Sequence, residues 1–245
     1  FLWGLFLNLG FIIIDEQHKF GVNQRIKLAK KGGKNCDLLL ISATPIPRTM
    51  MLSFFGDMDI SRLDEKPKYR KNIITLIKPE KKLDEILPLL KKEISLERQI
   101  FWICPLIDVS NNLNYTSAKK KFEQINKLFP NQVGLIHGGI DKKIKDKVLQ
   151  DFLIKKIKIL VSTTVIEVGI DFPSANTIII EDSNKFGLSQ LHQLRGRVGR
   201  GNTESICILL YKNNLSKNAR ERLKILRSTN DGFVIAEKDL QLRGF

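Results

Sequence analysis

Short apolar runs rich in β-branched residues recur along the chain, and each has the length of a strand buried on both faces of a parallel sheet. Helical patterns lie between many of them: Leu83–Lys92 carries an apolar stripe, and Asp141 stands at the N-cap position of another such pattern. Strands that alternate with helices predict an α/β fold. The predicted strands are Phe11–Ile14, Asp37–Ile41, Gln99–Ile103, Gln132–Ile136, Lys158–Val161, Thr177–Ile180 and Ser205–Leu210.

A charged, proline-containing segment, Asp64–Lys71, has no apolar period and predicts a boundary between two units. The first unit, residues 1–65, holds only two strands, which are too few for an independent sheet. Residues 66–72 read as a linker, and 73–212 accommodate a complete second α/β unit. Residues 213–245 turn helical from Leu215 to Arg227 and continue into a Thr229–Gly232 turn.

The composition favours a polyanionic partner without deciding it. A formal net charge of +15 creates a positive field that attracts nucleic acid, although lysine enrichment in a chain rich in Ile and Asn also fits biased codon usage. The three cysteines are far apart, which argues against a disulfide framework or zinc site and for a reducing cytoplasm. The apolar opening Phe1–Ile14 lacks a basic leader and is too short to span a bilayer, so we expect no membrane association.

Small polar and acidic residues follow three of the predicted strands. Asp15 and Glu16 come directly after the first strand, where Asp15 would hold a nucleotide-bound Mg²⁺ and Glu16 would orient the attacking water. Ser42-Ala43-Thr44 follows the second strand and suits a hinge. The segment Val161–Asp171, with its hydroxyls and Gly-Ile-Asp turn, suits contacts with nucleic-acid phosphates. Each pattern alone also fits an ordinary turn after a strand.

The arginine run Gln190–Gly201 is the most specific feature. Its three arginines fall within six residues and are separated by Gly196 and Gly199, which we expect to let the backbone approach a ligand. A guanidinium is a planar set of donors that suits phosphate oxygens and stabilises charge developing at a γ-phosphate. A merely solvated basic face would not need both glycines.

The order of these segments resembles that of superfamily 2 helicases, and longer stretches resemble the RecG helicase family. The resemblance covers the chain from about residue 8 onward. Position 17 is Gln, whereas the related transcription-repair coupling factors have Glu there; that translocase family is the nearest alternative. The stretches that carry the resemblance are Asp15–Arg25, Ala43–Thr49, Thr163–Asp171, Phe186–Gly201 and Asn230–Gly244.

The resemblance implies a RecA-like parallel sheet flanked by helices, preceded by part of a first motor domain and followed by a helical hairpin. It implies a catalytic set of Asp15, Glu16 (both also for Mg²⁺), Gln193, Arg197 and Arg200, acting on ATP. Residues that would couple nucleotide state to domain movement are His18, Ser42, Thr44, Gly169 and Asp171. Residues that would contact DNA are Thr163, Thr164, Glu167, His137, Gly138, Arg227 and Arg243. The implied partner is branched double-stranded DNA, bound by a cytoplasmic monomer.

No Gly-x-x-x-x-Gly-Lys-[Ser/Thr] loop occurs in the sequence, so the lysine that grips the β- and γ-phosphates is missing from these residues. We therefore expect a motor truncated at both ends and inactive by itself. The alternative is a non-catalytic, basic nucleic-acid-binding module.

Overall fold

The computed structural model describes residues 9–16, 27, 30–31, 36–42, 59–63, 65, 71–105, 111–163, 172–212 and 214–244, with the backbone alone for 111–116. It divides the chain into two compact units, residues 1–57 and 58–245. Most of the predicted linker, 66–72, lies outside the described residues, so that boundary stays a prediction.

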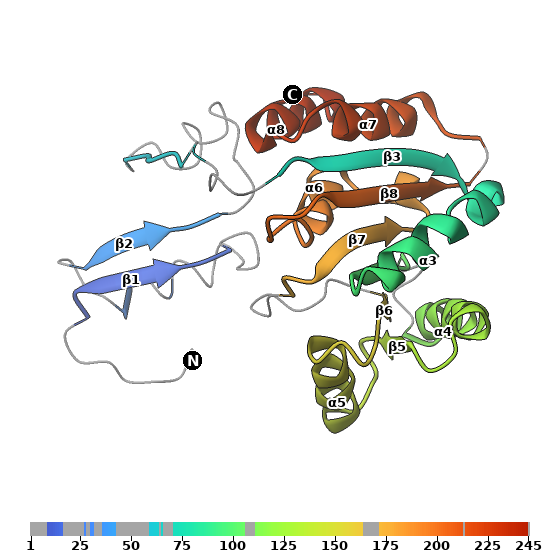
Figure 1. Ribbon diagram of the computed structural model, residues 1–245. Coiled ribbons are helices and arrows are strands. Elements are labelled where there is room, and N and C mark those ends of the chain that lie inside the picture. The colour runs from blue at the N-terminus through green and yellow to red at the C-terminus, as the bar shows by residue number, and fades with distance from the viewer. Residues whose placement is uncertain are drawn as a thin grey trace. The chain divides into compact units, whose positions relative to one another are not determined.

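The strands and helices follow the sequence pattern closely (Figure 1). All seven predicted strands are present with ends within two residues of those expected, and one strand, β3, was not predicted. The strands are β1 (Phe11–Ile14), β2 (Asp37–Leu40), β3 (Ile73–Pro79), β4 (Gln99–Ile103), β5 (Val133–Ile136), β6 (Ile159–Ser162), β7 (Ala175–Ile180) and β8 (Ser205–Tyr211). The helices are η2 (Glu80–Glu85), α3 (Leu87–Ser95), α4 (Asn111–Leu128), α5 (Lys142–Leu153), η3 (Ser183–Lys185), α6 (Leu188–Arg195), α7 (Lys217–Ser228) and α8 (Gly232–Leu242).

In the first unit, β1 and β2 pair in parallel, with Ile14 opposite Leu40. The second unit contains a six-stranded sheet in the order β3-β8-β7-β4-β6-β5, and all of its pairings are parallel. This is the RecA-like sheet that was expected.

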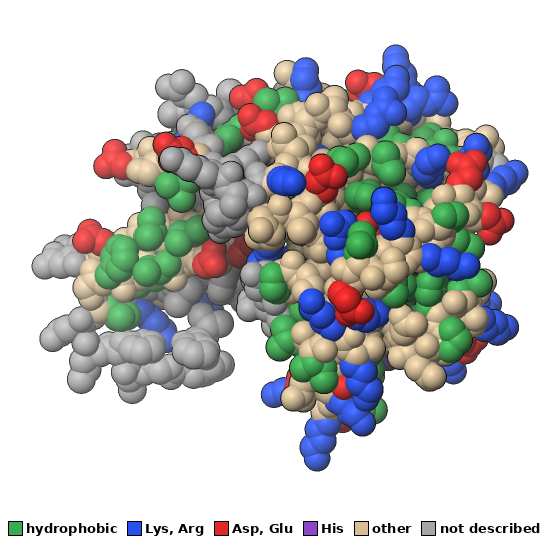
Figure 2. Space-filling view, viewed as in Figure 1, with side chains coloured by type: hydrophobic (Ala, Val, Ile, Leu, Met, Phe, Trp, Pro, Cys, Tyr) green, Lys and Arg blue, Asp and Glu red, His purple; other side chains and the backbone are tan. Residues whose placement is uncertain are grey.

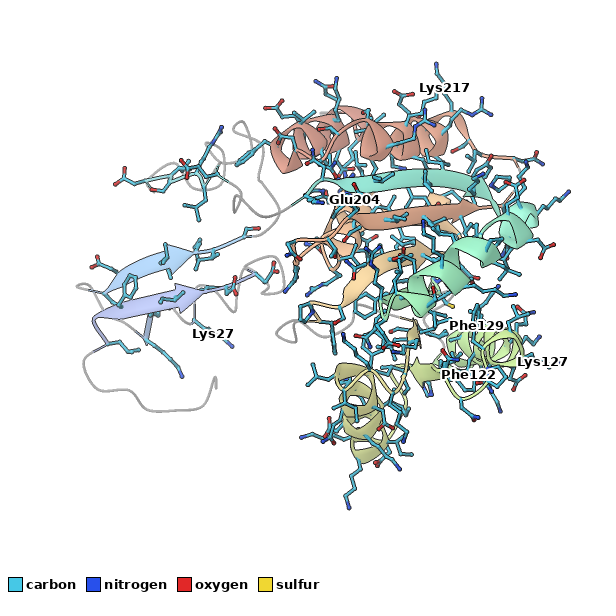
Figure 3. All side chains as sticks on the ribbon, in the orientation of Figure 1. Lys27, Phe122, Lys127, Phe129, Glu204 and Lys217 are labelled. Carbon is cyan, nitrogen blue, oxygen red and sulfur yellow. The ribbon has the colours of Figure 1, made fainter. Side chains whose placement is uncertain are left out.

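Helices cover both faces of the six-stranded sheet. Alternate residues of each strand point to opposite faces, so each buried strand packs against helices on both sides. Phe101 and Ile103 of β4 pack with α5, α6, α7 and α8 on one face. Ile100 and Trp102 pack with α3 and α4 on the other face. Figure 3 shows Phe122 and Phe129 at the α4 layer, with Lys127 pointing away from the sheet.

The predicted helix Leu83–Lys92 is broken into two pieces. A 3₁₀ helix, η2, ends at Glu85, and α3 begins at Leu87 with Pro88 in its first turn. Proline has no N–H for a preceding turn and its ring clashes with that turn, so it starts a new helix instead of continuing one. The predicted cap Asp141 is confirmed: its Oδ1 accepts a hydrogen bond from the Lys143 N–H at 2.8 Å.

Candidate functional site

The arginine run begins on α6, a short helix fixed tightly to the core. Leu188 and Leu191 are completely buried, and Leu194 is 4% exposed. The Gln190 side chain accepts a hydrogen bond from the N–H of Gly187 at 3.0 Å, which caps the start of the helix. The helix is therefore held firmly in place, and so is the backbone at its C-terminal end.

Arg195 is buried, whereas Arg197 is half-buried and Arg200 is exposed. Arg195 is 2% exposed, and its Nη1 donates to the backbone carbonyls of Leu226, at 2.5 Å, and Thr229, at 2.9 Å. Nη1 also lies 3.3 Å from the Thr75 hydroxyl oxygen. Burial lowers the pKa of the guanidinium from its ordinary value. Arg195 thus joins α6 to the end of α7, and the run does not consist of ligand-binding arginines alone.

The other two arginines of the run, Arg197 and Arg200, flank Val198 and Gly199. Val198 is fully buried and anchors the loop that follows α6. Gly199 has a φ of +74°, and a Cβ there would lie 2.9 Å from Cγ1 of Ile73. Arg197 is half-buried on one side of this anchor, and Arg200 is exposed on the other. Gly199 therefore serves packing and backbone conformation, and Gly196 has an ordinary helical φ of −66°. The expectation that both glycines let the backbone approach a ligand stays a prediction.

The helical hairpin of α7 and α8 is linked to α6 at a second place. Asp239 of α8 is buried and accepts from the Ser189 hydroxyl at 2.7 Å. The same carboxylate oxygen accepts from Nη2 of Arg243 at 2.9 Å. Arg243, predicted to contact DNA, is thus held by an ion pair although its side chain is 61% exposed.

The carboxyl edge of the large sheet gathers residues from separate segments. The Thr163 N–H donates to the carbonyl of Ile136 at 3.3 Å, which places Thr163 beside His137 and Gly138. His137 Nδ1 accepts from the N–H of Gly139 at 3.2 Å. Burial lowers the pKa of the imidazole. Thr164, Glu167, Gly169 and Asp171 fall in the stretch between 163 and 172 that is not described.

Two acidic residues at the same edge were not predicted as part of a site. Glu181 pairs with Lys121 at 2.7 Å, and Asp182 pairs with Lys185 and Lys212, each at 3.0 Å. Burial opposes ionisation of Asp182, but hydrogen bonds from the two lysines prevail and lower the pKa of its carboxyl. Glu181, Asp182, Lys121 and Lys212 line a pocket of about 220 Å³ together with Glu80 and Ser117. The buried strand end that carries Glu181 and Asp182 was the available signal in the sequence.

In the first unit, the register of β1 and β2 brings the predicted acidic residues and Ser42, the described residue of the predicted hinge, to one sheet edge. Asp15 and Glu16 directly follow β1, and Ser42 lies two residues after the end of β2. The Ile41 N–H donates to the carbonyl of Ile14 at 2.8 Å, so the pairing continues to this edge. Glu16 has a φ of +51°, and its N–H donates to Oδ1 of Asp15 at 2.8 Å. His18 and Thr44 are not among the described residues.

Residues 78–202, just over half of the chain, match the family described as the helicase conserved C-terminal domain. The chain belongs to this family. The matched residues run from the end of β3, through the arginine run, to the loop before β8.

This helicase C-terminal domain and its flanking residues resemble RecG, as the motifs predicted. The chain is 48% identical to the ATP-dependent DNA helicase RecG of Thermotoga maritima and 47% identical to that of Bacillus subtilis, in each case over 98% of the chain. It covers 31% and 35% of those two proteins, so it spans about a third of the length of the relatives it matches.

Solved structures also resemble this chain. RecG bound to a three-way DNA junction matches with a TM-score of 0.76 and 43% identity, covering 96% of this chain and 30% of that one. Dbp5 of Saccharomyces cerevisiae, bound to RNA and ADP BeF3, matches with a TM-score of 0.63 but only 16% identity. That match covers 95% of this chain and 62% of Dbp5, and it shows the shared fold alone.

The described part of the chain has neither a membrane-spanning helix nor a cluster of metal-ligating side chains. No helix there is both long and apolar enough to cross a bilayer. No group of three or more side chains there forms a metal-binding cluster. Of the three cysteines, Cys104 and Cys207 are buried free thiols, and burial raises the pKa of Cys207 to about 12.

Proposed function

We propose that this chain provides the second motor domain and the hairpin of an ATP-dependent translocase that acts on double-stranded DNA and remodels branched DNA. The observation that carries the proposal is the arginine run, in which the half-buried Arg197 and the exposed Arg200 flank the buried Val198–Gly199 anchor just after a helix that is fixed to the core. The identity to RecG proteins across nearly the whole chain supports the same function. ATP is the proposed substrate.

On the nucleotide side, Arg197 and Arg200 with Gln193 would contact the γ-phosphate, where guanidinium groups stabilise developing negative charge. Asp15 and Glu16 suit Mg²⁺, because the cation takes hard oxygen ligands, often only one or two carboxylates, and keeps several waters. When bound, Mg²⁺ would neutralise charge on the phosphates. Glu16 would orient the attacking water.

Coupling and DNA contact are proposed for two further sets of residues. Thr163, His137 and Gly138 share one sheet edge, which is the arrangement expected of a common phosphate-binding surface. Thr164 and Glu167 belong to the same predicted set. The proposed coupling residues are His18, Ser42, Thr44, Gly169 and Asp171, and the proposed DNA contacts on the hairpin are Arg227 and Arg243.

The hairpin would move together with α6. Arg195 fixes α6 to the end of α7, and Asp239 fixes α8 to Ser189 of α6. A displacement of the arginine run during the ATP cycle would therefore carry the hairpin, and any DNA on it, in the same direction.

Replacement of Arg197 by Ala in the full-length gene product tests the proposal. We expect ATP hydrolysis to fall by on the order of 10³-fold, because an arginine that stabilises the transferring phosphoryl group contributes at least that much. Affinity for branched DNA should change by less than about threefold. Lys147→Ala, an exposed substitution on α5, is the control for both measurements. Near-normal turnover of the Arg197→Ala protein would remove the assignment.

A second candidate function rests on the charge of +15 and on the absence of a phosphate-binding loop in these 245 residues. Under it, the chain binds nucleic acid without hydrolysing ATP in any context. The two functions differ in one observable, which is DNA-stimulated turnover by the full-length gene product. A monomeric state and a cytoplasmic location remain predictions.

A further inference from the structure

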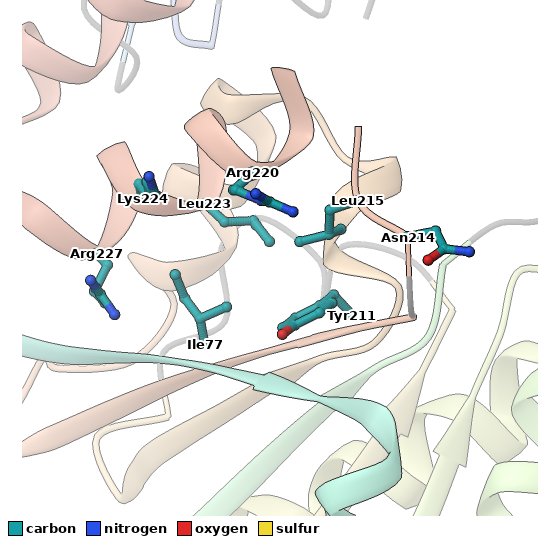
Figure 4. A pocket seen from close by; sticks show the side chains of 8 residues that line it. All are labelled: Ile77, Tyr211, Asn214, Leu215, Arg220, Leu223, Lys224 and Arg227. Atoms are coloured by element: carbon teal, nitrogen blue, oxygen red, sulfur yellow. The ribbon is translucent and has the colours of Figure 1, made fainter. Parts of the chain in front are cut away.

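A pocket of about 620 Å³ lies between α7 and the ends of β3 and β8 (Figure 4). Of its lining residues, only Arg227 has a place in the proposed function, as a DNA contact. Its volume is in the range of sites that bind small ligands or single side chains of a partner. The walls come from three places: β3, the β8 strand with the loop after it, and one side of α7.

The α7 wall is basic. Arg220, Lys224 and Arg227 are spaced by four and then three residues, so they lie on one side of the helix, and all three are exposed. Figure 2 shows a group of basic side chains over α7. Among the described residues, no carboxylate lines the pocket or forms an ion pair with these three side chains. Their charge is therefore available to an acidic ligand.

Apolar side chains form the floor of the pocket, and α7 itself contributes one of them, Leu223. Ile77, Leu215 and Leu223 line the pocket together with Tyr211, and Leu223 is 1% exposed. Contacts with duplex phosphates need no apolar floor, and unstacked bases bind chiefly by stacking on aromatic faces. Three aliphatic side chains and a single Tyr suit an apolar side chain of a peptide better than a nucleobase.

We propose that this pocket binds an acidic segment of a partner protein that carries one large apolar side chain. The apolar side chain packs against the half-buried Ile77, Tyr211 and Leu215, and the flanking carboxylates meet Arg220 and Lys224. Arg227 belongs to the same wall, so peptide and DNA compete if Arg227 also contacts DNA. This inference is independent of the ATP cycle and does not rest on it.

Fluorescence anisotropy with synthetic peptides tests the proposal on the full chain. The probe is a fluorescein-labelled nonapeptide of Asp and Gly with one central Phe, and its partner peptide has Ser in place of Phe. We expect the Phe peptide to bind about tenfold more tightly, because a buried Phe contributes at least that much. The double variant Arg220→Glu/Lys224→Glu should weaken binding of the Phe peptide by about tenfold or more.

The matched control is Lys142→Glu/Lys147→Glu, which changes the net charge equally at two exposed positions of α5. It should keep the affinity within about twofold, since only the general field is reduced. Where thermal unfolding shows that charge reversal on α7 prevents folding, Arg220→Ala/Lys224→Ala takes its place.

Three results would overturn the proposal. The first is equal binding of the Phe and Ser peptides, which would mean that the apolar floor plays no part. The second is an equal loss of affinity in the α5 control, which would reduce the effect to net charge. The third is that the α7 variant loses affinity for a 15-nucleotide oligothymidylate but not for the Phe peptide, which would assign the pocket to nucleic acid.

Discussion

At the scale of single residues, Arg195 and Arg197 are two positions apart but have opposite environments. Arg195 is enclosed by carbonyl oxygens of Leu226 and Thr229, whereas Arg197 is half-buried beyond the end of α6. The difference arises because Arg195 is the last residue of the helix, on the side that faces the core, and the chain turns immediately after it. Arginines that look equivalent in the sequence therefore differ in burial, and only Arg195 is shown to serve packing.

Gly199→Ala should destabilise the protein by about 1–3 kcal/mol. The added Cβ would lie 2.9 Å from Ile73 Cγ1, and a φ of +74° is strained for any residue with a side chain. Urea-induced unfolding measures the change in the free energy of unfolding. The control is Gly138→Ala, because a Cβ there meets nothing within 4 Å. An equally small effect at both positions would contradict the role given to Gly199.

Arg195→Ala should destabilise the protein by at least about 2 kcal/mol, because two backbone carbonyls lose a charged donor in a buried place. Arg195→Lys should restore little, since a single ammonium group does not reproduce the planar set of donors. Hydrogen exchange should become faster in α7 and in the turn before α8 and change less in β5 and β6. An equal change in the exchange rate across the whole unit would show that Arg195 does not hold the hairpin.

At the scale of elements, a buried carboxylate links η3 to the end of β8 through two ion pairs. Asp182, which precedes η3, pairs with Lys212 after the end of β8 and with Lys185 in η3 itself. The carboxyl is nearly buried, but both lysine side chains are exposed to 45% or more, so solvent screens much of the interaction.

Asp182→Asn should therefore lower the free energy of unfolding at pH 7 by no more than about 1 kcal/mol. The pKa of this carboxyl is lowered in the folded protein, so its stabilisation is complete above the ordinary pKa of 3.8 and is lost as the pH falls below it. Unfolding curves of both proteins between pH 7 and the acid limit of folding measure the difference. The difference in the free energy of unfolding between the two proteins should become smaller only near the acid end of this pH range. A difference that did not change with pH would contradict the ionic role of Asp182.

Much of the fold could be predicted from local sequence, because buried parallel strands are continuous apolar runs. β3 was missed since it is an edge strand that is only partly buried, ends in Lys78-Pro79 and follows a charged segment. The sheet order could not be predicted, because β3 pairs with β8, more than a hundred residues later. The motif order identified the candidate site residues, but the burial of Arg195 and the pairing of Arg243 with Asp239 depend on tertiary neighbours.

At the scale of the whole molecule, the charge of +15 and the DNA contacts proposed above predict strongly salt-dependent binding. We expect the dissociation constant of this chain for duplex DNA to rise at least about tenfold between 50 and 200 mM salt, because bound phosphates release counterions. Anisotropy with a labelled duplex at several salt concentrations gives the slope. Binding that hardly changes with salt would contradict a phosphate-binding surface.

The most direct test of the central claim is ATP hydrolysis by the full-length gene product with and without a three-way DNA junction. The account predicts turnover that the junction stimulates by at least about tenfold, and no turnover above background from the 245-residue chain, whose sequence has no phosphate-binding loop. A full-length gene product that binds the junction without hydrolysing ATP, or a 245-residue chain that turns over by itself, would contradict it.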